Sequence, residues 1–219
     1  MLIDALRRRF RRDGGFTLIE VITAIFVISI LATSALYFYL NGLNISHAQE
    51  RRQLAITVAN EAMETARGAT LGKTVNDVRV GIQAIYAGRD GAKVRQAFLD
   101  NLGVPGVAQT YPQWDASATS TSSPVFKVDP VPEVARSGTT FSVATLVGLC
   151  YQPTSGGDCI RLAPPPAIPP VATPVGYTPL TRIIVTVTWT AGSECTAGCR
   201  YSVSSLVDSN TDLQWNSVP

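Results

Sequence analysis

One apolar run constrains this chain more than any other feature of its sequence. Residues 16–40 contain a single charged side chain, Glu20, and five arginines precede the run within residues 7–12. A helix of these 25 residues is about 38 Å long, enough to cross a hydrocarbon core of roughly 30 Å. The run therefore predicts a membrane-spanning helix, with the basic leader in the cytoplasm and the rest of the chain outside.

Glu20 is not explained by a plain membrane anchor. A carboxylate in an apolar helix costs up to about 2.5–3.5 kcal/mol at the bilayer centre. Phe16 lies one helical turn before Glu20 and directly follows Gly14 and Gly15. If the chain is cut after Gly15, the new Phe16 amine and the Glu20 carboxylate can pair between two chains staggered by about one turn. The pattern predicts helices that stack in the core of a filament.

The segment Gly15–Val21, with the sequence GFTLIEV, resembles the cleavage and N-methylation site of type IV prepilins and of type II secretion pseudopilins. The resemblance implies a cut between Gly15 and Phe16, methylation of the Phe16 amine, and an inter-subunit salt bridge between Phe16 and Glu20. It also implies the partners of the chain: the prepilin peptidase/N-methyltransferase, the major pilin and other minor pilins, an inner-membrane assembly platform, and membrane lipid before assembly. Residues 55–67 are similar to the corresponding part of this helix in minor pilins of the pilus-modification type and in the related small pseudopilins, and this similarity favours a minor subunit.

Two other kinds of N-terminal segment explain the run less well. A signal anchor leaves Glu20 and the glycine pair without a role. A secretory signal has an apolar region of only about 7–15 residues, whereas the small residues Ala32-Thr33-Ser34 follow a longer run.

The domain organisation follows from these features. We expect a leader at 1–15, a transmembrane half of the helix at 16–40, an amphipathic half at 41–68, and an extracytoplasmic domain at 69–219. No proline occurs before Pro105, so a proline kink is not expected, and Gly68 is the expected stop signal. Gly42 and the flanking asparagines make residues 37–44 the weakest part of the helix, where we expect any melting during assembly.

The amphipathic half is expected to pack on a sheet. Its apolar side chains fall on one broad arc, with many alanines that permit close approach: Ile45, Ala48, Leu54, Ala55, Ile56, Val58, Ala59, Ala62, Met63 and Ala66. Arg51 and Arg52 interrupt this arc, either as a solvated break or as partners in an inter-subunit salt bridge.

The C-terminal part predicts a second, smaller helical region followed by strands. Residues 75–102 show a helical pattern broken at Gly88 and Asp90-Gly91, and residues 103–124 are typical of a loop. Period-two alternation predicts half-buried strands near 141–149, 182–190 and 200–207, the last two as a hairpin. Residues 164–179 contain seven prolines and should form a crossing loop outside the sheet. The predicted fold is α+β, a pilin-like ladle of one long helix on an antiparallel sheet.

The four cysteines are expected to form disulfides, because they all lie on the predicted outer side. They are Cys150, Cys159, Cys195 and Cys199. The pairs 150–159 and 195–199 would close short loops, but the sequence leaves all three connectivities open. A zinc site is the alternative, and the spacings fit common zinc knuckles poorly.

The sequence contains no catalytic, metal-binding or nucleotide-binding motif, so we expect no enzyme activity, metal or cofactor. The formal net charge is +2, and because the leader supplies the excess, the mature part gives no electrostatic footprint for nucleic acid. His47, the one histidine, and the tryptophans Trp114, Trp189 and Trp215 are expected to serve the surface, the interface or packing.

The predicted function is that of a structural minor pilin, held in the membrane and then extracted into a cell-surface or periplasmic filament. Three alternatives stay open: a type II secretion pseudopilin, a surface adhesin or binding module delivered by the pilin helix, and a membrane-anchored enzyme.

Overall fold

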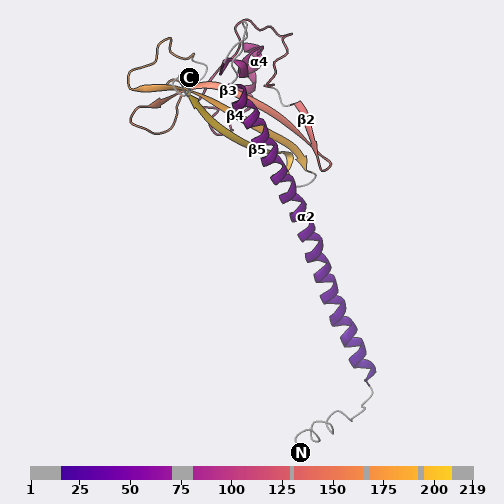
Figure 1. The fold of residues 1–219 in the computed structure, drawn as a ribbon. Coiled ribbons are helices and arrows are strands. Elements are labelled where there is room, and N and C mark those ends of the chain that lie inside the picture. The colour runs from indigo at the N-terminus through magenta and orange to yellow at the C-terminus, as the bar shows by residue number, and fades with distance from the viewer. Residues whose placement is uncertain (1–15, 71–80, 129–130, 165–167, 192–194, 209–219) are drawn as a thin grey trace, which may run out of the picture. The chain divides into compact units, whose positions relative to one another are not determined.

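A computed structural model describes residues 16–70, 81–128, 131–164, 168–191 and 195–208 (Figure 1). The chain divides into two compact units, Met1–Gln49 and Glu50–Pro219. In its described part, the first unit consists of the N-terminal portion of one long helix. The second unit contains the end of that helix, two shorter helices and a sheet.

The long helix α2 (Leu18–Thr70) has 53 residues and no break. In the first unit its hydroxyl side chains bond back to carbonyl groups one turn earlier, as in Ser29 Oγ to Ile25 O at 2.8 Å and Thr33 Oγ1 to Ser29 O at 2.8 Å. These bonds satisfy polar groups inside the helix, which lets serine and threonine lie in an apolar span. The helix continues two residues beyond Gly68, so the predicted end is slightly early.

The second unit is built on an antiparallel sheet. Its strands are β1 (Tyr111–Pro112), β2 (Val131–Arg136), β3 (Thr139–Pro153), β4 (Tyr177–Ala191) and β5 (Cys195–Asp208). The order is β1-β3-β4-β5, and β2 also pairs with β3. The hairpin β4–β5 is present as predicted, and Figure 1 shows it beside β3. One edge of β3 is shared, because β2 pairs with its first residues and β1 with Gly148 and Leu149.

One face of the sheet packs on the C-terminal part of α2. Phe141 and Val143 of β3 and Ile183 and Val185 of β4 form one core with the small side chains of the helix. The helix contributes the buried residues Ala55, Val58, Ala59, Met63 and Ala66. The predicted amphipathic arc is therefore confirmed over residues 55–66, whereas Ile45, in the first unit, is exposed.

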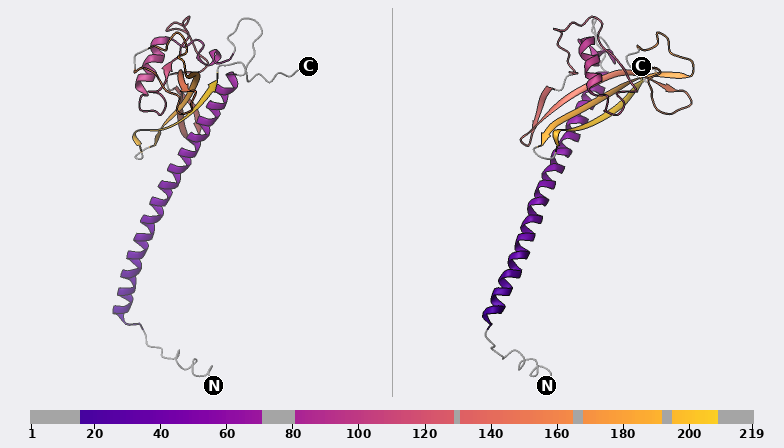
Figure 2. Two further views of the ribbon diagram at one scale, coloured as in Figure 1. Left: turned by 90° about the vertical axis from the view of Figure 1, so that its left-hand side faces the viewer. Right: turned by 180° about the vertical axis from the view of Figure 1, so that it is seen from behind.

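The other face of the sheet is also covered. Leu146 of β3 and Ile184 of β4 pack with helix α4 (Gly91–Asp100) and with the valines of the segment that follows it. Figure 2, left, shows the strands between α4 and the end of α2. Residues 143–148 and 181–187 are buried without interruption, so the predicted half-buried strands are wrong for the sheet centre. Period-two alternation in a sequence identifies one buried face of a strand. It does not reveal that a distant segment covers the other face of the sheet.

The second helical region is confirmed and is split where the glycines predicted a break. It forms the short helix α3 (Gln83–Tyr86) and α4, with Gly88 at φ 72° between them. Asp90 caps α4, because its Oδ1 accepts hydrogen bonds from the backbone N–H groups of Ala92 and Lys93 at 3.0 Å each. The predicted pattern over residues 75–80 lies outside the described residues.

Two strand predictions need correction at prolines. Strand β4 begins at Tyr177, so Pro179 lies inside the sheet opposite Tyr151 and not in the crossing loop. In the described chain, pairing between β4 and β5 begins at Leu180. Pro179 therefore needs no N–H on the side of β4 that faces β5. Strand β2 was not predicted. It contains Pro132, has a register shift between Pro132 and Val134, and pairs only with β3.

The structure contains two local disulfides, Cys150–Cys159 and Cys195–Cys199. Cys150 and Cys159 are 0% and 1% exposed, and their bridge ties the end of β3 to the following segment. Cys195 and Cys199 both lie in β5, opposite Ala191 and Trp189, so the prediction that they sit in the hairpin loop is wrong.

Replacing Cys150 and Cys159 together by alanine should lower the free energy of unfolding by about 2–3 kcal/mol, because the unfolded chain then loses the disulfide that constrains this loop. Thermal unfolding of the full chain in detergent micelles, followed by circular dichroism, measures the change. The disulfide between Cys195 and Cys199 closes a shorter and less buried loop. The matched double alanine variant that removes it should therefore lose less stability. An equal or larger loss in that variant would contradict the expectation.

Candidate functional site

The start of α2 carries the residues that the sequence singled out for assembly. Phe16 and Thr17 precede the first helical residue, Leu18. The carbonyl of Thr17 accepts hydrogen bonds from Glu20 N at 3.0 Å and Val21 N at 3.2 Å. The Oγ1 of Thr17 lies 3.4 Å from Glu20 N. Thr17 thus occupies the capping position, and the spacing Thr-x-x-Glu is that of a capping box.

Glu20 lies in the first turn of the helix. A carboxylate there is favoured by the positive end of the helix dipole, which offsets part of the cost of its apolar surroundings. In the described part of the chain, no cationic group forms an ion pair with the Glu20 side chain. Any partner for this carboxylate in a water-poor environment has to come from outside the described chain.

The surface around Glu20 is apolar, and no described part of the chain covers it. Every described side chain from Phe16 to His47 is exposed, and Phe16 is 80% exposed. By length and composition, α2 can cross a membrane, because its most apolar window has a mean hydropathy of 2.3. The N-terminal part of α2 is therefore suited to lipid or to other helices of the same kind, and Glu20 is the one charge in the run. Gly15 lies outside the described residues.

Comparison with protein families finds one match at this place. Residues 10–36 match the model described as the prokaryotic N-terminal methylation motif. No curated protein and no solved structure matches the chain.

The chain thus carries the prepilin-type N-terminal motif of type IV pilin-like proteins, and its fold is the pilin-like α+β arrangement of an apolar N-terminal helix and an antiparallel sheet. Proteins of this kind are structural and not enzymes. The motif implies processing by a prepilin peptidase and an inner-membrane-anchored precursor.

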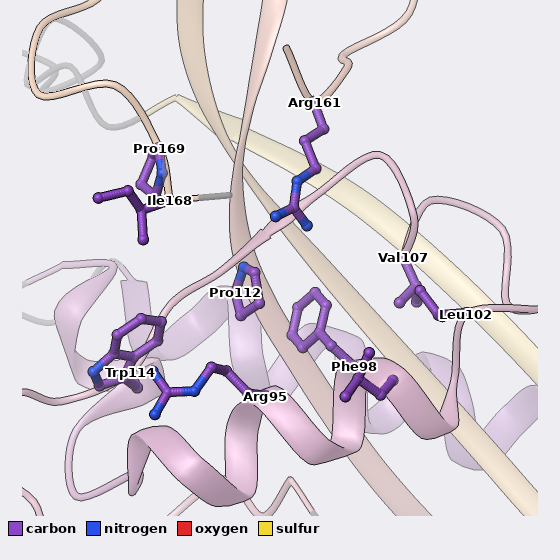
Figure 3. Close-up of a pocket in the computed structure, with 10 residues that line it drawn as sticks. Arg95, Phe98, Leu102, Val107, Pro112, Trp114, Arg161, Ile168 and Pro169 are labelled. Atoms are coloured by element: carbon purple, nitrogen blue, oxygen red, sulfur yellow. The ribbon is translucent and has the colours of Figure 1, made fainter. Parts of the chain in front are cut away.

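The second unit contains a mainly apolar pocket of about 160 Å³ that sequence reasoning did not find (Figure 3). Phe98 of α4, Pro112 of β1 and Ile168 line it. Figure 3 shows Arg95 beside Trp114 at one end of the pocket and Arg161 entering from another segment. The pocket therefore joins three parts of the chain that are far apart in sequence.

Both arginines of this pocket lie over aromatic rings. The guanidinium carbon of Arg95 is 5.0 Å from the ring centroid of Trp114, and that of Arg161 is 4.4 Å from the centroid of Tyr111. Burial lowers the pKa of the Arg161 guanidinium, and Tyr111 partly opposes this shift. An apolar cavity between two such cations is suited to a ligand with an apolar body and an acidic group.

The tryptophans behave as expected where they are described. Trp189 packs against Phe141 in the core, and Trp114 packs against the cluster under α4 while it lines the pocket. Trp215 lies outside the described residues. The pocket has no local sequence signature, because its arginines are separated by 66 residues and meet only through the fold.

Proposed function

We propose that this chain is a minor pilin: a subunit that is processed at its N-terminus, held in the membrane by residues 16–40, and then assembled into a type IV pilus-like filament. One observation carries the proposal, the single carboxylate in the first turn of an exposed apolar helix. After a cut between Gly15 and Phe16, the new amine and Glu20 of neighbouring chains neutralise each other in the filament core.

In this proposal the arginine-rich leader stays in the cytoplasm and the second unit lies outside the cell membrane. The apolar helix contacts lipid before assembly and the helices of other subunits afterwards. The second unit, including residues 50–70 of α2, forms the outer layer of the filament. The inner-membrane assembly platform, the major pilin and other minor pilins are the partners.

Mass spectrometry of the N-terminal peptide from native membranes tests the processing step. We expect a peptide that begins at Phe16 and carries a methyl group on its α-amine. A chain that begins at Met1 would be a signal anchor, and one that begins at Ala35 would be a secreted protein. Either result would contradict the proposal.

A type II secretion pseudopilin is the nearest alternative, since the same motif serves both kinds of filament. The genes beside this one separate the two. Genes for a secretin and exported enzymes favour a pseudopilin, and a gene for a retraction ATPase favours a pilin.

The pocket near Trp114 favours a further alternative, a binding module that the pilin helix delivers to the surface. The structure changes the fragment needed to test it. Ala55, Val58 and Ala59 belong to the core of the second unit, so a soluble fragment must begin at Glu50 and not at residue 69. Binding of fragment 50–219 to glycans or cells would support the binding module, and its absence would count against it.

A further inference from the structure

Arg89 is the largest fully buried side chain in the described chain, and it plays no part in the proposed filament contacts. It lies between α3 and α4 and is 1% exposed. Its backbone is held on both sides, because Arg89 N donates to Tyr86 O at 3.2 Å and Arg89 O accepts from Asp115 N at 3.0 Å. These two hydrogen bonds hold the main chain of Arg89 in place.

The guanidinium of Arg89 is only partly satisfied. Its Nε donates to the carbonyl of Phe126 at 2.9 Å, whereas Nη1 and Nη2 are buried and have no hydrogen-bond partner among the described residues. The buried Arg182 shows the contrast, since its terminal nitrogens donate to Gly106 O at 2.8 Å and Cys159 O at 2.6 Å. Arg89 therefore carries hydrogen-bonding capacity that the described part of the chain does not use.

Arg89 also keeps its charge. Burial lowers the pKa of its guanidinium to about 10, which leaves it protonated at neutral pH. The nearby carboxylate of Asp115 is engaged elsewhere, since its Oδ2 accepts from Gly88 N and its Oδ1 from Ser117. A buried cation without a counter-ion is costly, so such groups are normally paired.

Arg89 lines a polar pocket of about 340 Å³. Lys93 of α4 and Lys127 also line it, and Asp90 is the one acidic residue among the described lining residues. The Asp90 carboxylate caps the helix, where the backbone N–H groups of Ala92 and Lys93 already neutralise part of its charge. The described lining therefore contains more basic than acidic side chains, which is complementary to an anion.

The other wall of this pocket is the serine- and threonine-rich segment 120–123. A hydrogen bond from Lys93 Nζ to Ser120 O at 3.0 Å joins the segment to α4. An ammonium has three donors, so Lys93 keeps two for a ligand. Hydroxyl groups can donate to the further oxygens of an anion that has more than two, as phosphate and sulfate groups do.

We propose that this pocket binds a tetrahedral oxyanion, the phosphate or sulfate group of a small ion or of a sugar ester. Lys93 and the hydroxyls of residues 120–123 donate to its oxygens, and Arg89 supplies a buried counter-charge. The terminal nitrogens of Arg89 are closed to solvent, so Arg89 acts through its charge. The site belongs to the second unit alone and does not depend on filament assembly.

Isothermal titration calorimetry of the full chain in detergent micelles tests this site with four probes: inorganic phosphate, inorganic sulfate, glucose 6-phosphate and acetate. Chloride keeps the ionic strength constant. Phosphate and sulfate stabilise folded proteins in general, so saturable one-to-one binding is the required signal and a raised melting temperature is not. We expect at least one of the three tetrahedral probes to bind more tightly than acetate.

The probes also separate the two sources of the group. Tighter binding of an inorganic ion indicates a free anion, and tighter binding of glucose 6-phosphate indicates an ester of a larger ligand. Either result supports the site. No saturable binding of any tetrahedral probe, or acetate binding as tightly as they do, would overturn the proposal.

Two variants and one control tie the signal to the pocket. Lys93→Gln, at an exposed position, should weaken binding about tenfold, which corresponds to about 1.4 kcal/mol. Arg89→Met should abolish binding of the anion. If Arg89→Met does not fold, Lys93→Gln still tests the site. Arg200→Gln removes an exposed cation from β5 and should leave binding unchanged. Equal binding by Lys93→Gln and the unaltered chain would overturn the site.

Discussion

Replacing Glu20 by alanine should leave cleavage after Gly15 largely intact and greatly reduce incorporation of the chain into filaments. The peptidase acts at the other end of the motif, on a chain still held in the membrane by the apolar run. In the proposed filament, in contrast, incorporation requires the Phe16 amine of one subunit to find an anion at its own depth. Removing one partner of a pair buried in a low-dielectric environment typically costs about 3–5 kcal/mol, because the other charge is left unpaired.

The measurement compares two fractions of the same cells. The N-terminal peptide from membranes reports cleavage, and an immunoblot of sheared filaments reports incorporation. Glu64→Ala is a matched control, since Glu64 lies in the same helix and its Oε1 pairs with the exposed Arg67 at 3.1 Å. An exposed pair of this kind contributes little, so the control should assemble normally. Normal assembly of Glu20→Ala as well would remove the salt-bridge rationale.

Features set by local periodicity could be predicted from the sequence. The apolar run and the later arc of small residues each follow the helical repeat, and they gave the course of α2 to within a few residues of its end at Thr70. The alternation around Val185 and Val203 gave the hairpin β4–β5. The methylation motif was found because its residues are adjacent, so their spacing does not depend on tertiary structure.

Features that depend on distant contacts could not be predicted. Helix α4 and the segment that follows it cover the second face of the sheet. Neither changes the alternation of apolar and polar residues in the sequences of the strands beneath them. Strand β1 has only two residues and exists through its pairing with Gly148 and Leu149. Arg89 stands in the sequence Gly-Arg-Asp-Gly, which is typical of an exposed turn. Its burial follows from the positions of Asp115 and Phe126, which lie 26 and 37 residues further on.

Replacing Gly148 by alanine should destabilise the second unit by several kcal/mol, although the change adds only one methyl group. A Cβ at this position would overlap the carbonyl group of Tyr111 and the methyl group of Thr110. Both obstacles belong to β1 and its approach, where Pro112 pairs with Gly148. Overpacking a buried site typically costs about 1–3 kcal/mol, and more where main-chain atoms have to move.

The damage should extend to the apolar pocket, because β1 holds its surroundings in place. The guanidinium of Arg161 lies over the ring of Tyr111, and Thr110 Oγ1 accepts a hydrogen bond from the buried Arg182 at 3.1 Å. Displacing β1 therefore loosens both arginines together. We expect protection of the Gln113 amide, which follows β1 and donates to Val147 O at 3.0 Å, and of the amides in the neighbouring part of β3 to fall first in hydrogen exchange.

Gly68→Ala provides a control with the opposite sign. Gly68 is exposed in α2, and a Cβ there meets no atom within 4 Å. Alanine is favoured over glycine in a helix by about 1 kcal/mol, so this variant should be slightly more stable than the unaltered chain. Thermal unfolding of both variants in the same detergent gives the comparison. If Gly148→Ala unfolds at the same temperature as the unaltered chain, then β1 does not approach β3 as closely as the structure requires.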